Sequence, residues 1–124
     1  MKHMNIEEYR KITGQAKPVS QSKYHNDPCF VDGYRFDSKA EARRYQALKF
    51  LQQAGEIQGF GRQPSFVIGL GVRYIPDFIV CDASGKIWVE DVKSKGTETA
   101  TFKVKKNLFH ERYPWLELRL VMDA

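Results

Sequence analysis

The sequence predicts an α/β fold with a mixed sheet, and three observations support this prediction. Apolar residues recur every three positions in the second half of 38–54, which is the spacing of a helix with one buried face, and residues 98–113 form a second helix candidate. Three segments typical of strands lie between these two helices, and a fourth follows the second helix. The resulting order of hairpin, helix, three strands, helix and strand is typical of a sheet covered by helices.

The beginning of the chain differs from the rest in composition. Residues 1–28 are polar and include glycine, prolines and the stretch Ser20-Gln21-Ser22, so we expect a flexible N-terminal arm there. Residues 29–124 contain the periodic apolar segments and should form one domain, because a chain of 124 residues provides a single hydrophobic core.

Local signals mark the first elements of this domain. Residues 29–36 are typical of a short hairpin with Asp32-Gly33 as its tight turn. Asp37 or Ser38 then caps the first helix, and Gly55 ends it. The residues of this helix predicted to face the core are Tyr45, Leu48, Leu51 and Ala54.

Turn residues bound the strand candidates. The candidates span residues 63–68, 72–81, 86–93 and 116–122, and a loop of three residues ending in glycine joins the second to the third. The second helix ends before Pro114, because a proline disfavours the helical conformation in the residue before it.

The composition limits the classes of protein to which the chain is expected to belong. A net charge of +5 permits a polyanionic partner. The chain has no apolar run long enough to span a bilayer and no secretory signal, so we expect no membrane association. Cys29 and Cys81 lack the spacing of a metal site and are predicted to be free thiols in a reducing cytoplasm.

Two aspartates and a lysine in neighbouring strand candidates form the most informative pattern. Because side chains alternate along a strand, Asp91 and Lys93 share a face that is otherwise aliphatic. The loop after Asp82 sets the register of the hairpin, which places Asp77 opposite Asp91 and Ile75 opposite Lys93. Opposed β-carbons lie about 5 Å apart, so the two carboxylates repel unless a proton, a lysine or a cation is near.

A divalent ion between Asp77 and Asp91 would balance their charge. Hard oxygen ligands favour Mg2+, with Mn2+ as a substitute, over zinc. The alternative is structural: both acids would neutralise lysines on an exposed face, since Asp-x-Lys alone is a weak pattern. The Pro76-Asp77 pair on the preceding strand favours the functional interpretation.

With these residues the chain resembles a known superfamily. Pro76-Asp77, followed after thirteen residues by Asp91-Val92-Lys93, is similar to the signature of the PD-(D/E)XK nucleases. The segments Lys23-Tyr24-His25-Asn26, 31–41 and 90–93 resemble a family of small predicted endonucleases from phages and prophages, DUF1064.

The resemblance implies a restriction-endonuclease-like αβββαβ core, with a mixed central sheet flanked by helices and preceded by the hairpin and the arm. It implies hydrolysis of DNA phosphodiester bonds with Mg2+ or Mn2+, in the cytoplasm of a bacterial or phage-infected cell. Branched or junction DNA in phage recombination or replication is one expected substrate. Asp77, Asp91 and the carbonyl of Val92 would bind the metal, and Lys93 would position or activate the attacking water.

Three further residues have competing interpretations. Glu41 lies on the core-facing stripe of the first helix, and the resemblance implies that it would reach the metal, but Ser38-x-x-Glu41 is equally a capping box. Glu90 points to the opposite face from Asp91 and is the weaker ligand candidate, unless a bulge exchanges the two. Gln63 is a candidate for lining the cleft, and its place also fits an ordinary first residue of a strand.

The candidates for contact with DNA phosphates are basic. Lys103, Lys106 and His110 fall near one face of the second helix, and a solvated helix face is the alternative interpretation. The remaining candidates are Lys23, Arg43 and Lys95.

The sequence leaves three functions open. The first is a Mg2+-dependent DNA endonuclease, for which a second copy of the chain is a candidate partner. The second is a non-catalytic DNA-binding accessory protein of a phage or prophage. The third is a basic scaffold that docks on another protein, in which the acids are structural. The intact set of Asp77, Asp91 and Lys93 favours the endonuclease.

Overall fold

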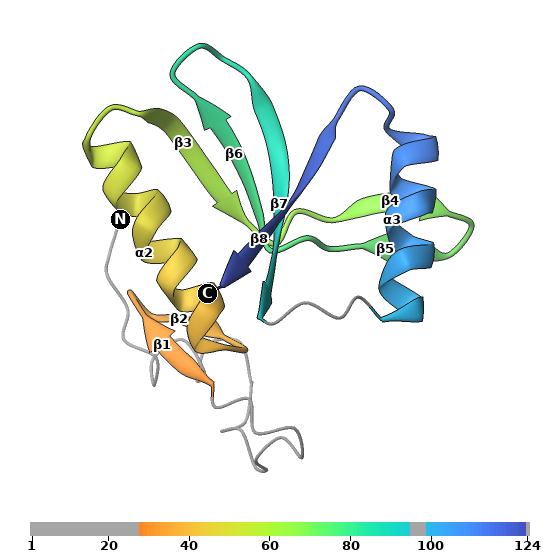
Figure 1. Ribbon diagram of the computed structural model, residues 1–124, viewed down its shortest axis with the longest axis horizontal. Helices are drawn as coiled ribbons and strands as arrows, with labels where there is room; N and C mark the ends of the chain where they lie inside the picture. Colours follow the sequence, from red (N-terminus) through yellow and green to blue (C-terminus); the bar gives the residue numbers. More distant parts are fainter. Residues whose placement is uncertain (1–27, 95–98, 124) are drawn as a thin grey trace. The chain divides into compact units, whose positions relative to one another are not determined.

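The computed structural model describes residues 28–94 and 99–123 (Figure 1). These residues form an α/β fold with a mixed four-stranded sheet, two helices and two further hairpins. The chain divides into two compact units, Met1–Arg43 and Arg44–Ala124, and the boundary between them lies within helix α2. The elements are β1 (Cys29–Val31), β2 (Tyr34–Phe36), α2 (Lys39–Gln53), β3 (Ile57–Arg62), β4 (Phe66–Gly69), β5 (Val72–Tyr74), β6 (Phe78–Asp82), β7 (Ile87–Ser94), α3 (Ala100–Arg112) and β8 (Glu117–Asp123).

The unit Met1–Arg43 contains the β1–β2 hairpin and the first turn of α2. Asp32 and Gly33 turn the chain between the two antiparallel strands with φ angles of 53° and 81°. Two positive φ angles are what a two-residue hairpin turn needs, so the predicted hairpin is confirmed. The N–H of Glu41 donates to the hydroxyl of Ser38 at 3.1 Å, so Ser38 caps the helix as expected.

Helix α2 ends at the predicted glycine. Gly55 has a φ of 79°, and its N–H and that of the next residue donate to carbonyls of the last helical turn. Tyr45 and Leu48 are buried and Leu51 is half-buried, as predicted for the core-facing stripe. Ala54 is exposed instead, because it lies beyond the last helical residue.

The unit Arg44–Ala124 is built on a sheet with the strand order β3-β6-β7-β8. Neighbours among β3, β6 and β7 are antiparallel, whereas β8 lies parallel to β7 (Figure 1). Parallel neighbours need a crossover connection, which α3 supplies between β7 and β8. The sheet is therefore mixed, as the sequence predicts.

Side chains of this unit cover both faces of the sheet. On one face, Val89 is fully buried in a cluster with residues of the β4–β5 hairpin and α3. On the other face, the rings of Tyr45, Phe60 and Phe78 pack edge to face, with centroids 5.6 and 6.2 Å apart, and attach α2 to the sheet. The other buried members of the Val89 cluster are Ile68, Tyr74, Phe102, Phe109 and Leu116.

The strand predictions before residue 72 are partly wrong. Strand β3 was not predicted, because Gly59 and Gly61 interrupt the apolar alternation of residues 57–62. Gly61 lies close to β6, since an added β-carbon would be only 3.2 Å from Cγ2 of Ile79. The strand expected over residues 63–68 begins only at Phe66.

The segment predicted as one strand over residues 72–81 forms two strands. β5 ends at Tyr74 and pairs with β4, whereas β6 begins at Phe78 and pairs with β3 and β7. Pro76 lies between them and has no N–H to extend a ladder. The expected pairing of Ile75 with Lys93 is therefore wrong, because the chain leaves the sheet at this proline.

Both cysteines are free, as predicted. Their thiols approach carbonyl oxygens nearby in the chain, Cys29 that of Ser38 at 3.6 Å and Cys81 that of Asp82 at 3.7 Å. Neither helix in the described part of the chain is long and apolar enough to cross a membrane.

Candidate functional site

The predicted register of the β6–β7 hairpin is confirmed. The N–H of Asp82 donates to the carbonyl of Lys86 at 2.9 Å across the expected loop, and the ladder runs to the first residue of β6. Asp77 directly precedes that residue, and its N–H donates both to the carbonyl of Glu90 at 3.0 Å and to Oδ1 of Asp91 at 3.1 Å. The two aspartates therefore lie side by side at the end of the strand pair.

Pro76 explains the position of the Asp77 carboxylate. The register of β6 and β7, continued by two pairs, would place Pro76 opposite Val92, where the proline has no N–H to donate to the Val92 carbonyl and the ladder stops. The N–H of Val92 donates to Oδ2 of Asp77 at 2.7 Å. Pro76 and Asp77 thus precede β6 and hold a carboxylate at the start of that strand.

Asp91 is 5% exposed, yet it carries an ionisable group. Its Oδ1 accepts from the N–H of Asp77, and its Oδ2 accepts from the hydroxyl of Tyr74 in β5. Burial raises the pKa of Asp91, and the Tyr74 hydrogen bond and the charge of Lys93 offset part of that rise. The surroundings penalise the ionised form, so a cation beside this carboxylate would be stabilising.

Tyr74 is a site residue that the sequence did not indicate. It is buried, and its ring packs against Phe102 and Phe109 with centroids 6.3 and 5.5 Å apart. Burial and the charges of Asp91 and Asp77 raise the pKa of Tyr74, so its hydroxyl stays protonated and donates to Asp91. Only the packing of the β4–β5 hairpin brings Tyr74 to the site, and no sequence pattern signals that packing.

Lys93 lies two residues after Asp91 on the same face of β7 and is half-buried. Its Nζ lies 4.0 Å from the centroid of the Phe102 ring, a cation–π contact. Phe102 is in the first turn of α3, and its N–H donates to the hydroxyl of the capping residue Thr99 at 3.1 Å. The start of α3 therefore helps to hold the Lys93 amine on the side of the sheet that carries Asp91.

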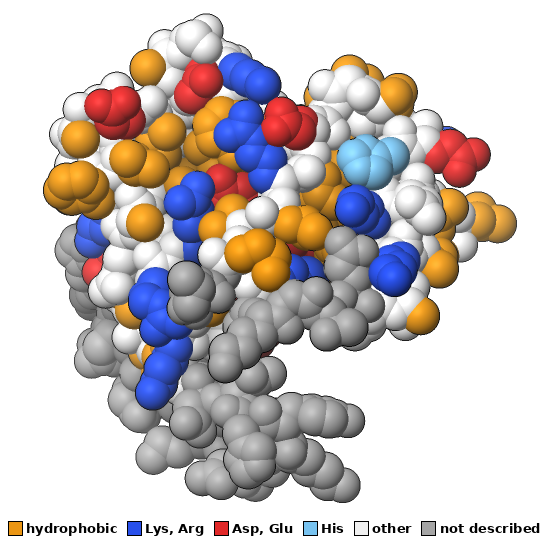
Figure 2. Space-filling view, in the orientation of Figure 1, with side chains coloured by type: hydrophobic (Ala, Val, Ile, Leu, Met, Phe, Trp, Pro, Cys, Tyr) orange, Lys and Arg blue, Asp and Glu red, His pale blue; other side chains and the backbone are white. Residues whose placement is uncertain are grey.

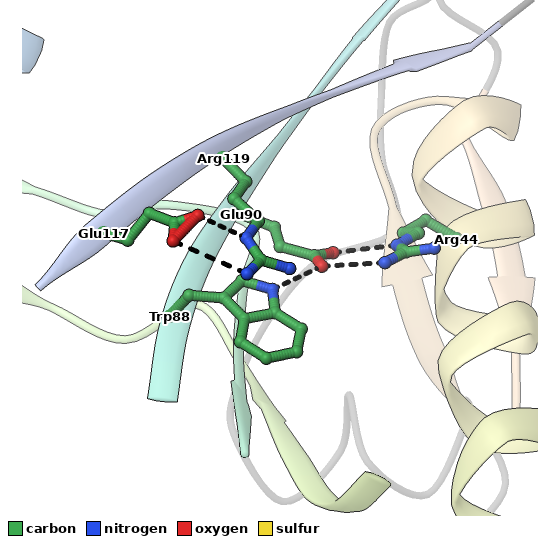
Figure 3. A network of polar contacts seen from close by, with 5 residues as sticks. All are labelled: Arg44, Trp88, Glu90, Glu117 and Arg119. Atoms are coloured by element: carbon green, nitrogen blue, oxygen red, sulfur yellow. Dashed lines mark hydrogen bonds and ion pairs between the residues drawn. The ribbon is translucent and has the colours of Figure 1, made fainter. Parts of the chain in front are cut away.

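Glu90 faces the opposite side of the sheet from Asp91, as predicted. It is 1% exposed, and Arg44 of α2 donates to both of its oxygens at 2.8 and 2.7 Å (Figure 3). Trp88 Nε1 donates to the same carboxylate at 2.8 Å, and the guanidinium of Arg119 lies 3.8 Å from the centroid of the Trp88 ring. Glu90 thus ties α2 to β7, and no bulge in the β6–β7 ladder exchanges it with Asp91.

The groups that could bind a metal here are the two carboxylates of Asp77 and Asp91 and the carbonyl of Val92, and all of them present hard oxygen atoms. The N–H and C=O of one strand residue point to the same edge, so the carbonyl of Val92 lies on the edge where its N–H meets Asp77. Within residues 28–94 and 99–123, no three Asp, Glu, His or Cys side chains form a metal-binding group. Mg2+ commonly uses one or two carboxylates with water and phosphate as further ligands, so this donor set fits that ion.

A comparison with protein families matches most of the chain to a family model. The family described as "Protein of unknown function (DUF1064)" matches residues 21–124. The chain belongs to the DUF1064 family. No curated protein and no solved structure matches it. The extent of the DUF1064 match includes Asp77, Asp91 and Lys93.

Two further candidate site residues belong to the DUF1064 region, Glu41 and Gln63. Glu41 is in the unit Met1–Arg43, where its N–H is capped by Ser38, and its role as a metal ligand stays a prediction. Gln63 is exposed, and its N–H donates to the carbonyl of Asp77 at 3.0 Å. Gln63 follows β3 with a φ of 53°, so the interpretation as the first residue of a strand is wrong.

The basic candidates of the DUF1064 region are divided between two helices. In α3, Lys103 and His110 are exposed and Lys106 is half-buried, and Figure 2 shows basic side chains over this helix. Arg43 is exposed on α2. Lys23 and Lys95 lie outside the described residues.

Proposed function

We propose that this chain is a metal-dependent endonuclease that hydrolyses DNA phosphodiester bonds. The observation that carries the proposal is the pair Asp77 and Asp91, joined through backbone amides at the end of two strands, with Lys93 on the same face. The order of β3, β6 and β7 followed by α3 and a parallel β8 agrees with the core that the PD-(D/E)XK resemblance implies.

The residues of the site would divide the chemistry among them. Asp77, Asp91 and the Val92 carbonyl would hold Mg2+ or Mn2+, which lowers the pKa of a bound water and neutralises charge on the phosphate. The Lys93 amine would donate a hydrogen bond to the attacking water or to a phosphate oxygen. Tyr74 would keep Oδ2 of Asp91 in place, and the basic side chains of α3 would contact phosphates beside the cut.

A non-catalytic DNA-binding accessory protein is the second candidate. The carboxylate oxygens of Asp77 and Asp91 accept hydrogen bonds from Val92, Asp77 and Tyr74, so both acids already have a structural use. This function keeps the basic α3 and needs no metal.

DNA cleavage by the purified full chain separates the two candidates. Branched, duplex and single-stranded DNA are incubated with Mg2+, with Mn2+ or with EDTA. Asp91→Asn keeps the shape and an acceptor for the Asp77 amide, whereas Glu117→Gln alters an exposed acid and is the matched control. The proposal predicts metal-dependent cutting that Asp91→Asn abolishes and Glu117→Gln retains. Binding without cutting in any metal would support the accessory protein instead.

A further inference from the structure

The β4–β5 hairpin is held firmly on its inner face. Phe66 and Tyr74, which are opposite each other in the hairpin, contact the ring of Phe109 in α3 at centroid distances of 5.2 and 5.5 Å. The hydroxyl of Tyr113 donates to the carbonyl of Val67 at 2.8 Å. Figure 1 shows the hairpin beside α3, with its turn reaching past the helix. The hairpin is therefore a rigid projection.

Apolar side chains remain exposed on this projection. Leu70, in the two-residue turn, is 104% exposed, and Gly71 beside it has a φ of 72°. Val67 is 55% exposed and Val72 38%, and Ile75, directly after β5, is 47% exposed. A single exposed leucine is ordinary, but several exposed apolar residues on one short hairpin indicate a contact surface.

The hairpin itself carries positive charge, because Arg73 is the only charged residue within residues 66–74. Residues 57–76 contain Arg62 and Arg73 and no aspartate or glutamate. Arg73 is exposed and lies opposite Val67 in the hairpin, so the two share a face. If a second copy of the chain bound here with twofold symmetry, the Arg73 side chains of the two copies would approach each other. A polyanion complements the surface better.

We propose that this hairpin binds the minor groove of base-paired DNA and that Leu70 inserts between two neighbouring base pairs. Proteins that bend DNA through the minor groove use apolar wedges of this kind next to basic side chains. The inference rests on the proposed function and adds a substrate class to it. That class is duplex DNA with a step that unstacks easily, such as a mismatch or a branch point.

Tyr74 links the hairpin to the site and limits the distance between wedge and cut. Its hydroxyl donates to Asp91, and Leu70 precedes it by four residues. Strand residues advance about 3.3 Å each, so with the tyrosine side chain the turn lies at most about 20 Å from the aspartates. At about 3.4 Å per base pair, the cut should fall within about six base pairs of the unstacked step.

Binding to DNA without cleavage tests this inference. The full chain in EDTA is titrated into a fluorescent duplex with one central mismatch, and 2-aminopurine at neighbouring positions reports unstacking. Leu70→Ser removes the wedge, Arg73→Gln removes the charge, and Phe50→Ser is the control because Phe50 is 67% exposed on α2. We expect Leu70→Ser to lower affinity about tenfold and to abolish the 2-aminopurine signal, while Phe50→Ser changes neither.

The outcomes separate this inference from the proposed endonuclease. Leu70-dependent unstacking without cutting in Mg2+ or Mn2+ would support the wedge and count against the endonuclease. Cutting of duplex DNA with equal binding by Leu70→Ser would support the endonuclease and overturn the wedge. If light scattering showed that the wild type is a dimer and Leu70→Ser a monomer, the surface would bind a second copy of the chain, and the wedge would be overturned. Absence of binding to any DNA would overturn both.

Discussion

Asp77 combines two roles at one position. Its carboxylate is a proposed ligand for the metal, and Oδ2 also accepts a hydrogen bond from the Val92 amide beyond the end of the β6–β7 ladder. Repulsion between the two carboxylates alone would predict that Asp77→Ala leaves folding intact. The hydrogen bond changes that expectation, since Val92 is buried.

Two substitutions of Asp77 should therefore differ in stability. Asp77→Ala leaves the Val92 N–H without an acceptor and should lower the free energy of unfolding by about 1–3 kcal/mol. Asp77→Asn keeps an oxygen for this N–H and should stay within about 1 kcal/mol of the wild type. Urea denaturation measures both, and equal stability of the two variants would show that this hydrogen bond contributes little.

Asp91 makes stability depend on pH. Its pKa is raised by burial, so the folded chain binds this proton more tightly than the unfolded chain does. The stabilisation is complete below the ordinary pKa of 3.8 and is lost as pH rises through the raised value. In EDTA, the wild type should lose stability relative to Asp91→Asn between acidic and neutral pH. A difference that stays constant across denaturation curves in this range would contradict the assignment.

Individual site residues were predictable to different degrees. Asp77, Asp91 and Lys93 followed from a local argument, because a three-residue loop sets the register of a hairpin. The face of Glu90 followed from strand alternation. Tyr74 did not follow, since contacts between separate sheets depend on packing that no short sequence pattern records.

At the level of elements, the ion pair of Arg44 and Glu90 connects α2 to β7. Glu90 is almost fully buried and accepts three hydrogen bonds, two from Arg44 and one from Trp88. The bond to Glu90 raises the pKa of Arg44, so the guanidinium stays charged. The same strand carries Asp91 on its other face, so this pair supports the position of the site.

Loss of the arginine should destabilise the fold strongly. Arg44→Met leaves the buried Glu90 carboxylate unpaired and should lower the free energy of unfolding by about 3–5 kcal/mol. Adding Glu90→Gln removes the unpaired charge and keeps an acceptor for Trp88, so the double variant should recover much of the loss. Gln46→Met, an exposed change on the same helix, is the control. Chemical denaturation showing a small effect of Arg44→Met alone would refute the argument.

Elements with strong local signals were predicted well, and the others were not. The capped α2, the β6–β7 hairpin and β8 were predicted from caps, turn residues and periodicity. Strand β3 was missed because glycines Gly59 and Gly61 carry no apolar side chain, although a neighbouring strand makes them part of the sheet. The break at Pro76 was missed because apolar residues precede the proline and resume at Phe78, after the single polar residue Asp77.

For the whole molecule, the net charge of +5 gives a prediction about salt. If Lys103 and Lys106 contact phosphates, replacing both by glutamine should reduce the slope of log affinity against log salt concentration by about two. Lys86→Gln, on the β6–β7 turn, should leave that slope unchanged. Fluorescence anisotropy across a salt series measures the slopes. Identical slopes for the wild type and the double variant would show that these lysines lie on a solvated face of α3 that does not contact DNA.

Metal binding by the aspartate pair is the central claim, and Mn2+ titration followed by electron paramagnetic resonance tests it most directly. Free hydrated Mn2+ gives a sharp signal that disappears on binding, so affinity is measured without DNA or turnover. We expect the wild type and the control Glu117→Gln to bind one Mn2+ with equal affinity, and Asp91→Asn to bind at least about tenfold more weakly. Equal binding by all three proteins, or no binding by the wild type, would contradict the claim.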